Sequence, residues 1–500
     1  MSLARGDEVA VITGVRLTGA DRTDPFGDDA VDVHLRDGVI VDIAPAGALP
    51  ARGAVVDGSG GWLVPGLWDH HVHTVQWALT AHRTALGDVD SAAEAASVMG
   101  RAPVLDDGRR VGTGFRDAFW ADVPSLALLD EKTGDVPTYL INADVHSVWL
   151  NSAAFSRESF VPTPDGILRE EPAFEISRRL NDLDAGVVDR YVRGALDRAA
   201  SRGVTGVVDL DMAWNADAWA RRLAAGFDGM RVSFGIYPAD LERAIAEGLA
   251  TGDALDPHGL IRVGSLKVIT DGSLGTRTAA CSHPYPGDPH NTGVMTVGPD
   301  DLRALMVRAT GSGLACAIHA IGDVANSHAL DAFAVSGATG TIEHAQLVAH
   351  ADIPRFARLG VGASVQPEHA IDDRDLTDSV WATQTALPYP LRSLADAGAN
   401  LLFGSDAPVS PLDPWAAMAA AVHRTRDGRA PWRAEQGVTA ATALAASTAG
   451  GSVTGSALEP GGVADVVVID RDPLTASDAD LRTTRVAATI LAGRLTHVDL

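Results

Sequence analysis

The sequence predicts an α/β protein whose centre is a (β/α)8 TIM barrel, with a small β-sandwich built from both chain ends and an insertion after the first barrel strand. Short apolar runs alternate with long Ala- and Leu-rich segments of helical period, which is the pattern of repeated βα units around a parallel sheet. Short alternating β-branched runs occupy both ends of the chain. Between residues 69 and 204 the chain runs several times the length of an ordinary βα repeat, which predicts the insertion.

The terminal runs predict one small domain. Gly and Asp turns join the runs at the N-terminus, and a similar pair of runs closes the chain, at residues 9–14, 31–35, 37–43, 465–470 and 488–494. We expect both ends to build a β-sandwich together, over residues 1–62 and 458–500.

The central runs are candidates for the barrel strands. Nine runs compete for eight places, at residues 63–69, 138–142, 204–209, 231–236, 263–269, 314–318, 341–343, 361–366 and 400–404. We assign the run at 138–142 to an inserted subdomain of about residues 77–190, because it lies inside the long gap. The barrel domain is then expected over residues 63–457.

Composition and charge exclude several classes of protein. The 500 residues include 40 Lys and Arg against 65 Asp and Glu, a formal net charge of −25, and this disfavours nucleic-acid and anionic-membrane partners. Hydrophobic residues at 46% and charged residues at 21% are typical of a globular protein. Two cysteines cannot form a disulfide framework, and the N-terminus has no signal-peptide pattern. We expect a cytoplasmic protein, with a homodimer as an open alternative.

The first candidate site is the His-x-His sequence at His71 and His73. Successive side chains on a strand alternate between its faces, so these two imidazoles are expected to point the same way and His70 the other. They follow an apolar run, and barrel enzymes place their chemistry at such strand ends.

Lys267 is the second candidate. The chain has only two lysines, Lys132 and Lys267, and Lys267 lies in an otherwise apolar run. One interpretation is a buried ion pair with a carboxylate. The alternative uses the ability of lysine, unlike arginine, to lose its proton and to react with CO2, which gives a carbamate able to bridge two cations.

Three further residues end apolar runs, namely His319, His344 and Asp406. Each has an ordinary structural interpretation when taken alone, for example a helix N-cap for Asp406. The ordered set of His-x-His, Lys, His, His and Asp at separate strand ends instead predicts one metal-binding centre.

This set resembles the metal-dependent amidohydrolase superfamily, in its amidohydrolase-3 or YtcJ-like branch of the N-substituted formamide deformylase type. The similarity covers nearly the whole chain, in motifs at residues 65–73, 146–152, 271–279, 319–323, 342–346, 404–409 and 459–468. One departure is Val324, where the group usually has arginine.

The resemblance implies a role for each of the six residues. His71 and His73 would bind one metal, Lys267 as a carbamate would bridge to a second, and His319 and His344 would bind the second. Asp406 would bind the first metal and move protons as the catalytic residue. The expected cofactor is Zn²⁺, as one or two ions, with another divalent metal as an alternative. The implied activity is that of an enzyme in which hydroxide from zinc-bound water cleaves a non-peptide carbon–nitrogen bond of a small-molecule substrate, such as an amide, N-formyl or N-acyl bond.

Six other residues are candidates for substrate binding: His146, Trp149, Asn151, Arg277, Gln366 and His369. Trp149 has an equally good interpretation as a core residue. Arg424, Arg426 and Arg429 are expected on the solvated surface. Two other functions stay open at this stage: the same metal site acting on a lactone, ester or cyclic amide, and a catalytically silent scaffold with the same fold.

Overall fold

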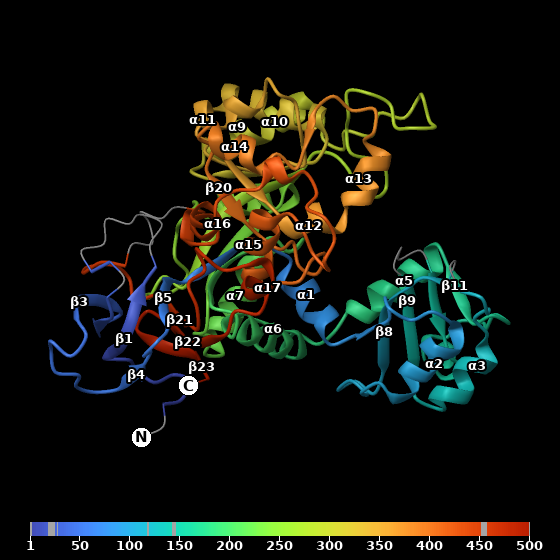
Figure 1. Cartoon of the computed structure of the whole chain (residues 1–500). Coiled ribbons are helices and arrows are strands. Elements are labelled where there is room, and N and C mark those ends of the chain that lie inside the picture. Colours follow the sequence, from blue (N-terminus) through green and yellow to red (C-terminus); the bar gives the residue numbers. More distant parts are fainter. Residues whose placement is uncertain are drawn as a thin grey trace. The chain divides into compact units, whose positions relative to one another are not determined.

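The computed structural model describes residues 3–18, 26–27, 29–117, 120–142, 147–451 and 458–499. The chain divides into two compact units, Val75–Ala195 and the remainder of the chain (Figure 1). None of the helices in these ranges has the length and apolar character that crossing a membrane requires.

The larger unit contains the predicted barrel. Eight parallel strands form one sheet, in the order β20-β18-β16-β15-β14-β13-β12-β6. They are β6 (Leu67–Val72), β12 (Val204–Asp209), β13 (Arg231–Ile236), β14 (Ile261–Ile269), β15 (Cys316–Ala320), β16 (Gly340–His344), β18 (Gly362–Val365) and β20 (Leu401–Phe403). The two outermost strands approach each other, because the backbone N–H of His73 donates to the carbonyl of Ala407 at 3.0 Å. The sheet is therefore a nearly closed barrel.

Seven helices in the described part of the chain contact strands of this sheet (Figure 1), namely α7 (Asn215–Ala224), α9 (Pro299–Thr310), α10 (Asp323–Ser336), α11 (Ile353–Leu359), α14 (Leu391–Asp396), α15 (Pro414–His423) and α16 (Ala440–Ala446). The larger unit also contains α8 (Leu241–Ala246), α12 (Pro367–Asp372), α13 (Arg374–Val380) and α17 (Asp478–Arg482). A two-stranded ribbon of β17 (Leu347–Val348) and β19 (Leu387–Pro388) lies among the connecting segments.

Both chain ends contribute to a second sheet in the larger unit. Its strands are β1 (Val11–Leu17), β2 (Val31–Arg36), β3 (Val39–Pro45), β4 (Val55–Asp57), β5 (Trp62–Pro65), β21 (Val466–Ile469), β22 (Val486–Leu491) and β23 (Arg494–Val498). They follow one hydrogen-bonded path, β23-β22-β21-β5-β1-β2-β3, with β4 paired to β1. The pairings of β1 with β4 and β5 are parallel, so the sheet is mixed. That it forms a two-layered sandwich stays a prediction.

The run at residues 63–69, predicted as the first barrel strand, divides between two sheets. Its first part is β5, which pairs with β21 of the terminal sheet, and its second part begins β6 of the barrel. Gly66 separates them at a close approach, where an added Cβ atom would lie 2.3 Å from Thr205 Oγ1. A continuous apolar run does not reveal this change of partner, because both strands are buried.

The unit Val75–Ala195 has a sheet and core of its own. The sheet order is β11-β10-β9-β8-β7, and β9 carries the run at 138–142 that was excluded from the barrel. Its strands are β7 (Thr84–Ala85), β8 (Arg110–Phe115), β9 (Thr138–Asn142), β10 (Ser147–Leu150) and β11 (Ile167–Arg169). Its helices are α2 (Ala92–Arg101), α3 (Leu126–Thr133), α4 (Ser152–Glu158) and α5 (Glu171–Asn181), while α1 (Thr74–Ala81) and α6 (Ala185–Ala200) span its two boundaries.

Candidate metal centre

The six residues predicted as metal ligands all lie on barrel strands or directly after them. His71 lies in β6 and His73 just after it, Lys267 in β14, His319 in β15 and His344 at the end of β16, and Asp406 follows β20. Parallel strands end at the same face of a barrel, so the topology brings these side chains to one region.

The imidazole of His71 is oriented by Glu343. His71 is buried, and its Nδ1 lies 2.7 Å from Oε2 of Glu343, which is buried in β16. Burial raises the pKa of this carboxyl, but the hydrogen bond from His71 and the charges of Lys267 and His71 together outweigh burial, and the pKa falls to about 2. The ionised carboxylate only accepts, so Nδ1 carries the hydrogen and Nε2 keeps a lone pair. Burial lowers the pKa of His71 to about 4, which keeps the ring neutral at physiological pH.

Asp406 faces both histidines of the His-x-His sequence. Its Oδ1 lies 3.4 Å from Nε2 of His71 and 3.2 Å from Nε2 of His73. Burial raises the pKa of Asp406, but His71, His73, His344 and His369 together outweigh burial and hold this pKa well below its usual range. The residue has a left-handed backbone, with φ 55°, which turns its side chain away from the path that the strand would give it. Asp406 is therefore an ionised carboxylate aimed at two imidazoles.

His344 is the third member of the cluster, after His71 and Asp406. Its Nδ1 lies 2.8 Å from Oε1 of Gln366, so the hydrogen on Nδ1 leaves Nε2 available. Its ring centre is 4.9 Å from that of His71 and 4.5 Å from that of His319. One nitrogen or oxygen atom each from His71, His344 and Asp406 lies within 4.8 Å of the other two. Nitrogen and carboxylate donors at this spacing fit a divalent transition metal.

Lys267 adds a buried amine to this centre. Its side chain is 1% exposed, and its Nζ has no hydrogen-bond partner among the described residues. Burial lowers the pKa of Lys267, while the charges of Glu343 and Asp406 act in the opposite direction. A buried amine without a partner is costly, and the neutral form is the one that reacts with CO2. The described structure therefore gives Lys267 no hydrogen-bonded partner that would make it a structural ion pair.

Two of the predicted substrate residues lie beside the metal centre. Gln366 accepts from His344, and its own Nε2 is buried without a partner in the described structure. The ring of His369 lies parallel to that of His344 at 6.5 Å, and its Nε2 is likewise without a partner there. Arg277 is exposed on the loop after β14. None of these contacts identifies a substrate.

The inserted unit gives its two described candidates a structural role instead. Trp149 is fully buried in an apolar cluster with Leu140 and Phe115. Asn151 caps α4 by accepting from Ala154 N, and it accepts from Thr138 N as well. Its Nδ2 faces Thr133 Oγ1 and the carbonyls of Gly134 and Val136, so no hydrogen-bonding capacity is left for a ligand. Both side chains therefore have a structural role in the inserted unit, and their assignment to substrate binding stays a prediction. His146 lies outside the described residues.

Two carboxylates of this region were not predicted to have a role. Glu343 orients His71, and Asp271 lies 3.4 Å from Nε2 of His319. Glu343 directly precedes His344 in the sequence. An acidic residue beside a candidate metal ligand is the sequence signal that could have indicated this role. The partner of Glu343 comes from a strand 272 residues away, which only the fold reveals.

Comparisons with known proteins agree with this centre. The sequence profile of the amidohydrolase family matches residues 54–497, so the chain belongs to the amidohydrolase family. The protein is a metal-dependent hydrolase. The family resemblance inferred from the sequence motifs is confirmed. The alternative of a silent scaffold is thereby set aside.

The alignments with individual relatives cover most of the chain. Protein LONG AFTER FAR-RED 3 of Arabidopsis thaliana is 28% identical over 97% of this chain and 91% of its own length. An N-substituted formamide deformylase of Arthrobacter pascens is 27% identical over 90% of this chain and 91% of its own. The crystal structure of an uncharacterized metal-dependent hydrolase of Pyrococcus furiosus superposes with a TM-score of 0.78 at 26% identity, covering 93% of this chain and all of that one.

Proposed function

We propose that the protein is a zinc-dependent enzyme that hydrolyses a non-peptide carbon–nitrogen bond of a small molecule. The observation that carries the proposal is the grouping of His71, His344 and Asp406, whose donor atoms lie within 4.8 Å of one another beside a buried lysine. Imidazole and carboxylate are preferred ligands of Zn²⁺, and a catalytic zinc keeps a position open for water.

The residues divide into two sets that would hold one or two ions. His71, His73 and Asp406 would bind the first, and His319 and His344 the second, with a carbamate on Lys267 between them. The hydrogen bonds from His71 to Glu343 and from His344 to Gln366 support this division, because each leaves Nε2 as the free donor atom.

In the reaction, a bound zinc ion would lower the pKa of a water ligand to about 7 and so supply hydroxide at neutral pH. Asp406 would accept the proton of the attacking water and pass it to the departing nitrogen. Its lowered pKa supports a carboxylate that is ionised before the reaction begins. Glu343 and Gln366 would hold two ligand rings in one tautomer through the cycle.

We further propose an N-acyl or N-formyl amine with an aromatic or aliphatic substituent as the substrate. Support comes from the relative that is named for an N-substituted formamide deformylase activity. The net charge of −25 also disfavours polyanionic substrates, since a negative field lowers their local concentration.

A substrate panel tests the proposal. Zinc-loaded protein is assayed with formamides, acyl amino acids, lactones and phosphoesters, and Asp406→Asn serves as the background control. We expect turnover of formamides or acyl amines. Activity confined to lactones or phosphoesters would reject the carbon–nitrogen bond and leave the metal centre in place.

A further inference from the structure

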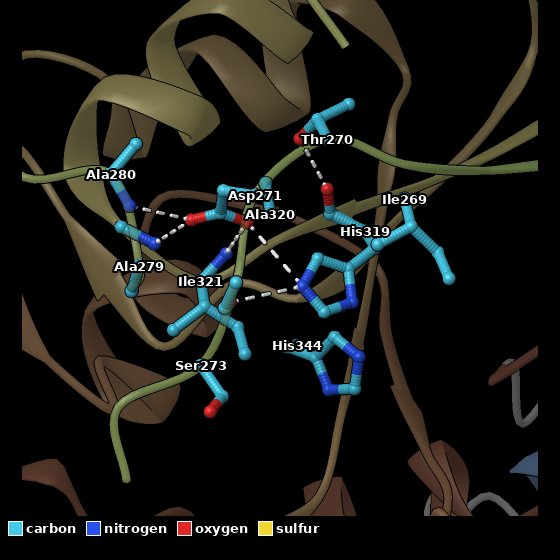
Figure 2. Close-up of polar contacts among 12 residues, drawn as sticks. Ile269, Thr270, Asp271, Ser273, Ala279, Ala280, His319, Ala320, Ile321 and His344 are labelled. Carbon is cyan, nitrogen blue, oxygen red and sulfur yellow. Dashed lines mark hydrogen bonds and ion pairs between the residues drawn. The ribbon is translucent and has the colours of Figure 1, made fainter. Parts of the chain in front are cut away.

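Asp271 is a buried carboxylate that joins two loops at the barrel mouth. It lies two residues after the end of β14 and is 1% exposed. Its Oδ2 accepts backbone N–H groups from Ala280 at 3.0 Å and Gly322 at 2.8 Å, and its Oδ1 accepts that of Ile321 at 3.1 Å (Figure 2). One acceptor therefore ties the loop after β14 to the loop after β15.

The two loops are packed closely where Asp271 joins them. A Cβ atom added to Gly322 would lie 1.9 Å from the carbonyl oxygen of Ala280, so the backbones touch without any side chain between them. The loop after β15 begins at Ile321, two residues after His319. The position of that histidine is thus tied to the position of the loop after β14.

The same carboxylate faces the ring of His319. Nε2 of His319 lies 3.4 Å from Oδ1 of Asp271 and 3.4 Å from the carbonyl oxygen of Gly272. Both neighbours only accept hydrogen bonds, so Nε2 carries the hydrogen and the lone pair is on Nδ1. Figure 2 shows the imidazole between Asp271 and the ring of His344, whose centre is 4.5 Å away.

We propose that Asp271 is a positioning residue that holds His319 as the Nε2–H tautomer and so presents Nδ1 to the metal centre. The proposal rests on the metal-binding function proposed above. Carboxylates that accept from the second nitrogen of a ligating histidine fix its orientation, and losing one typically costs roughly 10–100-fold in metal affinity. His319 then differs from His71 and His344, whose Nδ1 atoms are occupied and whose Nε2 atoms are free.

The experiment compares Asp271→Asn with a matched control, Asp323→Asn. Asp323 is also buried and braces the same loop by accepting from Ser282 N at 2.9 Å, but no described contact joins it to His319. Zinc affinity is measured by chelator competition, together with the melting temperature of the metal-free protein. We expect both variants to have a lower melting temperature than the wild-type protein. Only Asp271→Asn should lose affinity, by roughly 10-fold or more.

A double-mutant cycle separates positioning from general damage. In a His319→Ala background, Asp271→Asn should leave the remaining zinc affinity unchanged while still lowering the melting temperature. Equal affinity losses in Asp271→Asn and Asp323→Asn, or an undiminished loss in the His319→Ala background, would overturn the proposal. Wild-type protein that binds no zinc would instead refute the proposed function.

Should Asp271→Asn fail to fold, the wild-type protein supplies the test. Nitrogen NMR with isotope-labelled histidine reports the tautomer of His319, whose signal is identified by its loss in His319→Gln. A hydrogen on Nε2, with a Nδ1 signal that shifts on zinc addition, is the expected result. A hydrogen on Nδ1 would overturn the proposal.

Discussion

Two buried polar residues, one in each compact unit, differ in how their hydrogen-bonding capacity is used. Asn151 of the inserted unit is fully buried, and both polar atoms of its side chain have protein partners. Lys267 of the barrel is 1% exposed, and its Nζ has no described partner. Burying a polar group is tolerated when it is hydrogen-bonded and is costly when it is not.

The difference is the one expected between a structural polar residue and a functional one. Asn151 stabilises the fold, because it supplies the hydrogen bonds that neighbouring backbone groups need. The buried amine of Lys267 should cost stability in the metal-free protein, and the carbamate and metal ions that we propose would complete its surroundings. Partner-free burial is by itself an imperfect marker, since the indole Nε1 of Trp149 also has no partner in the described structure. A buried polar atom without a partner is stronger evidence for a functional site where several titratable groups lie close together.

The largest effect is expected at Asp406, on the functional side of this contrast. Asp406→Asn should keep the fold, because volume and one oxygen remain, while kcat falls by about 10²–10⁴ through loss of the general base. The control is Asp413→Asn, at a carboxylate that caps α15 and pairs with Arg202. Near-native kcat in Asp406→Asn would remove this residue from the mechanism.

The two lysines of the chain offer the next test. Lys267→Arg keeps a positive charge but cannot form a carbamate, so we expect loss of most activity and of at least one metal equivalent. Lys132→Arg is the matched control, because Lys132 lies on the surface beside Glu131. Elemental analysis and kcat provide the measurements. In Lys267→Ala, added short carboxylates should restore part of the activity. Unchanged metal content in Lys267→Arg would disprove the carbamate.

Substitutions at Asn151 and Lys267 should change the stability of the metal-free protein in opposite directions. Asn151→Ala leaves buried backbone donors without partners, at about 1–3 kcal/mol for each. Lys267→Met replaces a partner-free amine by an apolar chain and should stabilise the metal-free protein by about 1–3 kcal/mol while abolishing activity. Denaturation of zinc-free samples measures both. A destabilised Lys267→Met would show that the lysine contributes to the fold.

The smallest effect concerns pH. Burial lowers the pKa of His73, but the hydrogen bond to Asp406 and the charges of Asp406 and Asp211 together outweigh burial and raise the pKa above the ordinary value of 6.5. Below the raised pKa a proton competes with the metal for this ring, so zinc affinity should fall by up to about 10-fold per pH unit as the solution is acidified. Chelator competition between pH 6 and 8 measures it. In His73→Ala the slope should be shallower, and an unchanged slope would exclude His73 as the titrating group.

The sequence by itself determined the barrel and the family. Alternating apolar runs and helical segments predicted eight parallel strands, because strand and helix periods are local properties of the chain. The motifs around His71, His319, His344 and Asp406 identify the amidohydrolase resemblance without reference to any three-dimensional contact.

Tertiary structure decided how those side chains are aimed and what supports them. His344 and Asp406 have positive φ angles of 74° and 55°, so strand alternation alone does not give their directions. Arg424, expected on the surface beside Arg426 and Arg429, is fully buried with its guanidinium 5.3 Å from the ring of Trp432. Glu343 and Asp271 acquire their roles from partners on other strands. Hydrogen-bond satisfaction and burial depend on residues far apart in the chain, and only the folded structure brings those residues together.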